Sequence, residues 1–214
     1  MSKLVTLLAD NLEEQKIIDG LTVSRETIDL LKQYQELIIK WNKKTNLVSK
    51  STIVDLWYRH IVDSLQLIKY IDDQEIHLVD VGSGAGFPGI VMSLAGIKEV
   101  TLIEANTKKA SFLSYIASVS SNKINVINKR AECVNIDCDI ITSRACANIK
   151  DTLALTHQYT LRDKYLILKG LTYQHEIDTA QQAWTFDYET YPSLTSIDGV
   201  VVKMNKINKL ILGF

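Results

Sequence analysis

Two segments near the start of the chain carry apolar residues three and four positions apart, the spacing of one face of an α-helix. The first follows Ser24, a residue that suits a helix N-cap, and its apolar positions are Ile28, Leu31, Tyr34, Leu37, Ile38 and Trp41. The second follows Ser51, with Ile53, Val54, Trp57, Ile61, Leu65 and Ile68 on one face. The polar stretch 42–46 separates them. We therefore predict two amphipathic helices, capped by Ser24 and Ser51.

From Ile76 onward the pattern changes to short apolar runs that alternate with helical segments. The runs are residues 77–81, 99–104, 124–127, 139–142 and 165–168. Because parallel strands need crossover connections, this alternation predicts an α/β fold with a doubly wound, mostly parallel sheet. Two later runs, 184–188 and 200–204, predict an antiparallel closing pair. We expect a helical N-terminal extension, residues 1–74, and one α/β domain, residues 75–214.

Length and composition fit this organisation. The 214 residues are 46% hydrophobic and 23% charged, as in an ordinary soluble globule. No apolar run approaches the roughly 18 residues that span a bilayer. Residues 1–10 contain an apolar stretch but lack the basic start and the cleavage site of a signal peptide, so we expect the start of a helix in a cytoplasmic protein. The three cysteines, Cys133, Cys138 and Cys146, form no C-x-x-C pair or metal-ligand spacing, which favours buried or incidental thiols and no metal site.

The strongest local signal is the glycine loop, residues 80–89, which reads Asp-Val-Gly-Ser-Gly-Ala-Gly-Phe-Pro-Gly and follows the first predicted strand. Glycines at a strand-to-helix turn permit positive φ angles and close approach of a ligand. In a doubly wound sheet this turn lies at the carboxyl end of the strand, where such folds bind ligands. Residues 84–89 also satisfy the dinucleotide pattern G-x-G-x-x-G, which is weak by itself.

Two acids favour S-adenosylmethionine as the ligand of this loop over a dinucleotide. Asp80 stands two residues before Gly82, where a carboxylate would repel a pyrophosphate but suits the cationic amino group of a methionine moiety. Glu104 ends the next strand, where it would accept hydrogen bonds from ribose hydroxyls, as either cofactor requires. Three alternatives remain open: Asp80 as a helix cap, Glu104 as an exposed strand end, and the glycines as a purely structural turn.

Several short motifs, taken in order, resemble the bacterial 16S ribosomal RNA guanine-N7 methyltransferase G family (RsmG, also called glucose-inhibited division protein B). The motifs are Trp41-Asn42-Lys43, Thr45-Asn46-Leu47, residues 59–65, the glycine loop, Lys108-Lys109, Phe112-Leu113, Arg130-Ala131-Glu132, Ser143-Arg144-Ala145 and Leu168-Lys169-Gly170. Each is common alone, and their order and spacing make the resemblance specific. The segment 132–143 is short for the family, and the tail after Gly170 is only weakly similar.

The resemblance implies a class I, Rossmann-like methyltransferase that moves a methyl group from S-adenosyl-L-methionine to N7 of a guanine in 16S ribosomal RNA. This reaction is rRNA methylation, a step of rRNA processing in the cytoplasm. The implied partner is the small ribosomal subunit, approached by a monomer. The residues implied or proposed to contact the cofactor are Gly82, Phe87, Ala131, Glu132, Arg144, Asp80, Gly84 and Glu104.

The implied chemistry fits the residues present. Guanine N7 has a lone pair and no proton, so its methylation needs positioning and no general base. We therefore predict no catalytic acid or base, and keep Arg144 as a contact to the cofactor or the substrate. The Asn/Asp-Pro-Pro-aromatic loop of amino-directed methyltransferases is missing after residues 139–142, which argues against an exocyclic adenine amine. His60 is kept as a packing residue.

RNA binding must come from a local patch, because the net charge is only −1. Between residues 40 and 59 the chain has five basic residues and one acid, Asp55, and the basic ones are Lys40, Lys43, Lys44, Lys50 and Arg59. A solvated polar face is the alternative interpretation of this patch. Two other functions remain open: methylation of a small molecule or protein, and a noncatalytic nucleoside- or RNA-binding module.

Overall fold

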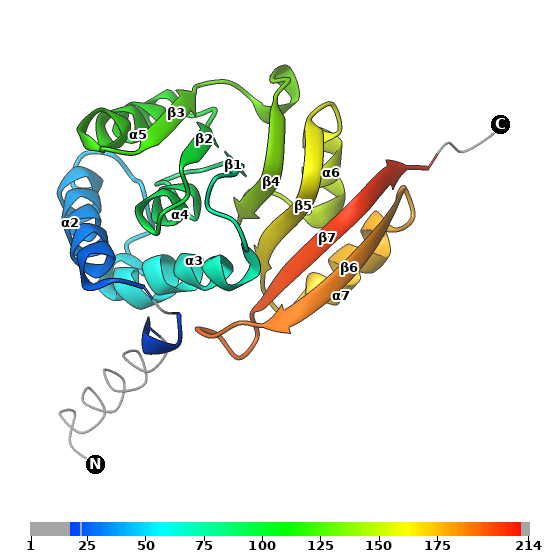
Figure 1. Ribbon diagram of the computed structural model, residues 1–214, viewed down its shortest axis with the longest axis horizontal. Coiled ribbons are helices and arrows are strands. Elements are labelled where there is room, and N and C mark those ends of the chain that lie inside the picture. Colours follow the sequence, from blue (N-terminus) through cyan, green and yellow to red (C-terminus); the bar gives the residue numbers. More distant parts are fainter. Residues whose placement is uncertain (1–17, 22, 211–214) are drawn as a thin grey trace, which may run out of the picture.

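A computed structural model describes residues 18–21 and 23–210, and its centre is a seven-stranded sheet (Figure 1). The strand order is β3-β2-β1-β4-β5-β7-β6. The strands are β1 His77–Val81, β2 Glu99–Ile103, β3 Lys123–Ile127, β4 Asp137–Arg144, β5 Thr160–Lys169, β6 Trp184–Pro192 and β7 Val200–Lys209. The first five run parallel, and β7 lies antiparallel between β5 and β6. The predicted sheet and its antiparallel closing pair are confirmed.

Helices cover both faces of the sheet, as the strand composition requires. Alternate residues of β1 point to opposite faces, and both sets are buried: Leu78 belongs to one apolar core, Val79 and Val81 to the other. The crossover helices are α4 Gly89–Leu94, α5 Thr107–Val119, α6 Ile149–Thr156 and α7 Tyr173–Ala180. Figure 1 shows α4 and α5 on one side of the sheet and α6 and α7 on the other.

The first predicted helix is confirmed as α2, Arg25–Asn42, with Ser24 as its cap: the Ser24 hydroxyl accepts a bond of 3.1 Å from the amide of Thr27. Its buried residues Leu31, Tyr34 and Ile38 share one core with side chains of the sheet and of α4 and α5. The helical extension is thus packed into the core of the sheet. The boundary between residues 74 and 75 stays a prediction.

The second predicted helix is irregular. Residues 53–70 form a 3-10 turn Ile53–Asp55, a π-helix Trp57–Val62, the short α3 Asp63–Leu65 and a second 3-10 turn Gln66–Tyr70. The Ser51 cap is wrong, because Ser49 accepts the amide of Thr52 at 3.2 Å. Val54 is also not on a buried face, since it is 88% exposed. π-helical turns are frequent at functional sites.

Within the described ranges no helix has the length and apolarity needed to cross a bilayer. The helix predicted to start within residues 1–10 lies outside the described residues.

A candidate ligand site at the carboxyl ends of the parallel strands

The glycine loop connects β1 to α4 and takes a backbone path that only glycine adopts without strain. Gly82 and Gly84 have φ angles of 69° and 59°. A β-carbon on Gly82 would lie 2.2 Å from the sulfur of Cys146, so this side of the loop is closed. A β-carbon on Gly84 would meet only the Gly82 carbonyl oxygen, at 3.8 Å. The Gly84 side is therefore the one that a ligand is able to approach.

Glu104 faces this open side from the end of β2. One of its carboxylate oxygens accepts a bond of 2.7 Å from the amide of Gly84, and the other accepts one of 2.7 Å from the amide of Asn106. The side chain is only 8% exposed, so the open alternative of an exposed strand end is wrong. A carboxylate has about four lone-pair sites, and two amides leave room for two further donors. The residues present thus fit a ribose with two free hydroxyls.

Asp80 lies beneath the loop and has no exposed surface. Its two carboxylate oxygens accept bonds from the amide of Gly89, at 3.2 Å, and from the hydroxyl of Thr142, at 3.0 Å. Burial raises the pKa of Asp80 to about 6. The helix-cap alternative describes this position, because Gly89 begins α4. A direct contact between Asp80 and a ligand stays a prediction.

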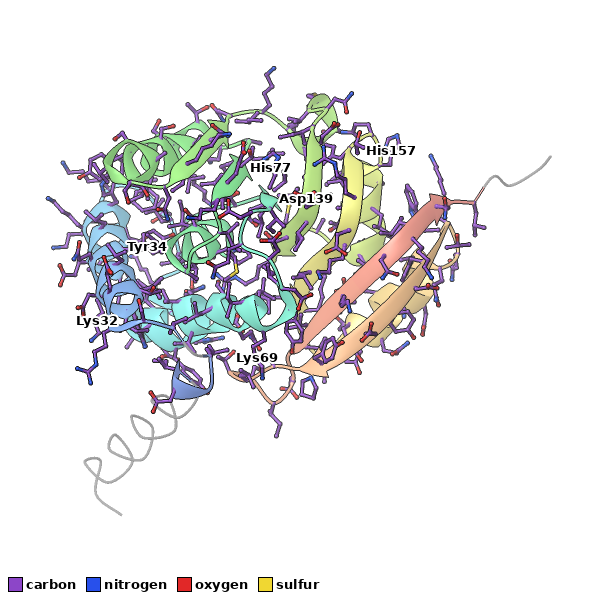
Figure 2. The ribbon with its side chains drawn as sticks, viewed as in Figure 1. Lys32, Tyr34, Lys69, His77, Asp139 and His157 are labelled. Carbon is purple, nitrogen blue, oxygen red and sulfur yellow. The ribbon has the colours of Figure 1, made fainter. Side chains whose placement is uncertain are left out.

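Phe87 is buried, and three side chains pack against its ring. The His60 ring lies nearly parallel to it, with centroids 5.2 Å apart, and the Arg144 guanidinium carbon lies 4.9 Å from its ring centroid. Tyr34 packs on the same ring at 5.7 Å, and its hydroxyl donates to the carbonyl of Ala85. Figure 2 shows Tyr34 on the side of α2 that faces α4. The helical extension thereby contacts the glycine loop directly.

Arg144 ends β4 and is held by three protein acceptors. Its guanidinium donates to the carbonyl of Arg59 at 3.0 Å, to the carboxylate of Asp63 at 3.3 Å and to Nδ1 of His60 at 2.6 Å. Burial lowers the pKa of Arg144 from its ordinary value, and the charge of Asp63 acts against that shift. The guanidinium is therefore fixed between the π-helix and the glycine loop.

His60 is a packing residue, as predicted, and its contacts with Phe87 and Arg144 place it beside the glycine loop. Burial, followed by the charges of Arg144 and Arg59, lowers the pKa of His60 to about 4, so the ring is neutral at pH 7. The buried Nε2 has no hydrogen-bond partner among residues 18–21 and 23–210. The available signal for this placement was the spacing of Arg59, His60 and Asp63 within one motif, on a segment whose π-helical turn the periodicity did not reveal.

A cavity of about 810 Å³ opens beside this cluster at the carboxyl ends of β4 and β5. Its walls combine Arg59 and Arg144 with the loop after β4, the end of β5 and the turn between β6 and β7. The volume lies in the range of small-ligand sites, roughly 300–1,000 Å³. The cavity adjoins the glycine loop through Cys146, which packs against Gly82 and lines the cavity. The arrangement places a cavity of ligand size next to the glycine loop.

Ala131 and Glu132 lie on a 3-10 turn, Ala131–Cys133, that follows β3. The Ala131 carbonyl accepts bonds from Tyr159 at 2.8 Å and from Gln158 at 3.1 Å, so the turn is anchored to the segment before β5. The Glu132 side chain is exposed. Both residues follow β3, the neighbour of β2, and Glu104 directly follows β2.

The five basic residues of the predicted patch do not form one surface around the cavity. Lys40, Lys43 and Lys44 lie at the end of α2, whereas Arg59 is on the cavity wall. None of the five makes a side-chain ion pair within the part of the chain that the structure describes. In contrast, Lys169 in the cavity wall pairs with Glu176 at 2.8 Å.

Comparison with known proteins gives one consistent family. The family model GidB, described as rRNA small subunit methyltransferase G, matches residues 27–203. A protein named ribosomal RNA small subunit methyltransferase G, from Rickettsia prowazekii (strain Madrid E), is 47% identical over 189 residues, which cover 88% of this chain and 99% of the relative. The protein of the same name from Rickettsia typhi (strain ATCC VR-144 / Wilmington) is 48% identical over the same length, with the same coverage of both chains.

Solved structures with low sequence identity share the fold alone. The ribosomal protein L11 methylase of Lactobacillus delbrueckii subsp. bulgaricus is 14% identical and superposes with a TM-score of 0.55, covering 67% of this chain and 76% of its own. M. jannaschii TYW2, solved in complex with AdoMet, is 17% identical with a TM-score of 0.54, covering 72% and 78%.

Proposed function

The chain belongs to the rRNA small subunit methyltransferase G family, and we propose that it transfers a methyl group from S-adenosylmethionine to N7 of a guanine in 16S ribosomal RNA. The predicted family and class I methyltransferase fold are confirmed. The assignment of the site rests on one observation. Glu104 accepts the amide of Gly84 on the open side of the glycine loop and keeps acceptor capacity for further donors, and the same loop adjoins the cavity.

We propose specific roles for the residues at the cofactor position. Gly82 and Gly84 give the backbone path, and Glu104 accepts the ribose hydroxyls. The turn at Ala131 and Glu132 contacts the cofactor, as the family resemblance implies. Three further residues act on the shape of the site: Asp80 holds the loop to α4, Phe87 supports the loop from its buried side, and Arg144 fixes the wall between the cofactor and the cavity.

The reaction makes modest demands on the protein. When bound, S-adenosylmethionine would supply a sulfonium-activated methyl group to the N7 lone pair of the guanine, and the carbon–sulfur bond would be the one that breaks. No proton is removed, so no general base is required. The protein has to hold N7 in line with that bond and exclude water, and good positioning contributes roughly 7–11 kcal/mol. The neutral His60 and the buried, ion-paired Arg144 give a wall that neither donates nor takes a proton near pH 7.

The partner follows from the substrate. We propose that the enzyme acts as a monomer on 16S ribosomal RNA within the small subunit, in the cytoplasm. Lys40, Lys43, Lys44 and Lys50 would bind phosphates outside the cavity, and Arg59 would bind one at its wall. These contacts would be electrostatic and would weaken with salt.

The test is a transfer assay with mapping of the product. Under-methylated small subunits and protein-free 16S RNA are each incubated with labelled S-adenosylmethionine, and the modified base is located by mass spectrometry. We expect label on one guanine, in a form that carries the methyl group at N7. A Glu104→Ala variant that folds but transfers no label serves as the control. Label on an adenine amine, on a protein or on a small molecule would overturn the proposed substrate.

A further inference from the structure

The most exposed large apolar side chains of the described residues border the cavity. Ile197 is 100% exposed, Val54 88% and Leu171 76%. Val54 precedes Asp55, Leu171 follows Gly170, and Ile197 follows Ser196, and each of these neighbours lines the cavity wall. The three apolar residues come from three separate segments of the chain, and each is next in sequence to a residue of one cavity wall. Large exposed apolar side chains at the edge of a ligand-sized cavity favour an interaction surface.

Ile197 is presented by a turn that is held in place. The turn, residues 193–199, connects β6 to β7. The Leu194 amide donates to the side-chain oxygen of Gln66 at 2.9 Å, and the Thr195 hydroxyl donates to the carboxylate of Asp63 at 2.6 Å. Within the turn, the Gly199 amide donates to the carbonyl of Ser196 at 3.1 Å. Figure 1 shows the turn beside the helical segment that contains α3.

The same contacts connect this turn to the wall of the cofactor site. The carboxylate of Asp63 accepts the Thr195 hydroxyl through one oxygen and the Arg144 guanidinium through the other. The backbone of the turn that carries Ile197 is therefore anchored beside the cavity. A contact that is rigid before binding loses less entropy when the partner binds.

The proposed substrate explains why such a residue is needed. In a paired RNA helix the N7 atom of guanine faces the major groove, which is too deep and narrow for side chains to reach. Enzymes that modify such an atom rotate the nucleotide out of the stack into a pocket, at a cost of unstacking. Apolar side chains inserted between bases take part in comparable distortions of nucleic acids.

We propose that Ile197 inserts into the RNA stack next to the methylated guanine and keeps that nucleotide extruded into the cavity, while Leu171 and Val54 contact the flanking bases. The inference rests on the proposed function and adds to it the surface that opens the RNA. The partner is the RNA of the proposed function, and the exposed apolar residues lie beside the cavity wall, outside its ion-paired residues.

The test compares Ile197→Ser with a matched control, Val119→Ser. Val119 is also exposed, at 60%, but it ends α5, on the β3 side of the sheet and far from the turn in strand order. We expect Ile197→Ser to lower kcat/KM for under-methylated small subunits by about tenfold or more, since unstacking has to be driven by other contacts. Its Kd for S-adenosylmethionine should stay within about twofold of the wild type, as for any side chain outside the cofactor site. Ile197→Leu should retain the wild-type rate.

A fluorescence measurement separates insertion from simple contact. An RNA fragment that contains the mapped guanine carries 2-aminopurine at the adjacent position, and the protein is added to saturation. We expect the wild type to raise the fluorescence and Ile197→Ser to bind without raising it. Equal rises, or equal methylation rates of wild type and Ile197→Ser, would overturn the role of Ile197 and leave the proposed function standing. A wild type that places no methyl group on the subunit would overturn both.

Discussion

Nδ1 of His60 lies 2.6 Å from Nη2 of Arg144, and an arginine is only able to donate in such a contact. Nδ1 is therefore the acceptor, and the ring of His60 is neutral with its proton on Nε2. Both side chains also lie against Phe87, which is part of the glycine loop. The pair thus connects the π-helix, the end of β4 and the glycine loop.

The environment of His60 and that of Asp80 give opposite dependences of stability on pH. The pKa of Asp80 is raised from 3.8 to about 6, so the folded state binds more protons than the unfolded state in this window, and stability falls as pH rises through it. The pKa of His60 is lowered from 6.5 to about 4, so here the unfolded state binds more protons, and stability rises with pH. In the wild type the two effects oppose each other.

Single substitutions should separate the two effects. Relative to the wild type, Asp80→Asn should gain about 2 kcal/mol in unfolding free energy between pH 4 and pH 7, from a shift of about two pKa units. His60→Gln should lose stability relative to the wild type over the same interval. Urea unfolding at several pH values measures both differences. If the unfolding free energies of the two variants changed with pH in the same way, both pKa shifts would be contradicted.

Removal of the Glu104 carboxylate should abolish most of the cofactor affinity. Each hydrogen bond to a charged group contributes roughly 1.5–3 kcal/mol, so Glu104→Ala should raise the Kd for S-adenosylmethionine at least about tenfold. Glu99→Ala is the matched control, because Glu99 begins β2, the strand that Glu104 directly follows, and pairs with Lys123 at that other end. Calorimetry gives both values. Wild-type affinity in a folded Glu104→Ala protein would remove this residue from the site.

The close approach of Cys146 to Gly82 predicts that a second substitution will restore part of the stability lost in Gly82→Ala. Gly82→Ala places a β-carbon 2.2 Å from the Cys146 sulfur at a φ of 69°, which should cost about 1–3 kcal/mol for the backbone and more for the overlap. Adding Cys146→Gly should recover the overlap part of the loss and leave the backbone part. Thermal unfolding of both variants and of Cys146→Gly alone checks this. A double variant that is no more stable than Gly82→Ala would show that the overlap with Cys146 is not what destabilises Gly82→Ala.

The basic end of α2 should contribute to RNA binding through charge alone. Lys43 and Lys44 have no ion pair within the described residues, so their replacement by Ala should weaken subunit binding and flatten the dependence of log K on log salt by between about one and two units. Lys32→Ala is the control, since Figure 2 shows Lys32 pointing away from the body of the protein. Cofactor binding should not change. A wild-type slope would move the RNA-binding surface to Lys108, Lys109 and Arg130.

Periodicity determined most of the fold. The runs of apolar residues predicted the strands, and the helical segments between them predicted that the strands run parallel. Both patterns depend on neighbours only a few positions apart. The same local patterns predicted α2 and its Ser24 cap, and the order of the motifs predicted the family. The signal failed at residues 53–70, where the hydrogen-bond pattern changes three times within one helical segment and no apolar spacing records such a change.

The sequence by itself determined the class of fold, the family and the glycine loop with its two acids. The tertiary structure decided the contacts of these parts: Asp80 is buried and accepts the amide of Gly89, Glu104 accepts the amide of Gly84, and His60 contacts Arg144. The reason is distance along the chain. The bonds of Arg144 to His60 and of Thr195 to Asp63 join residues 84 and 132 positions apart, and their geometry depends on how the sheet brings strand ends and the β6–β7 turn together.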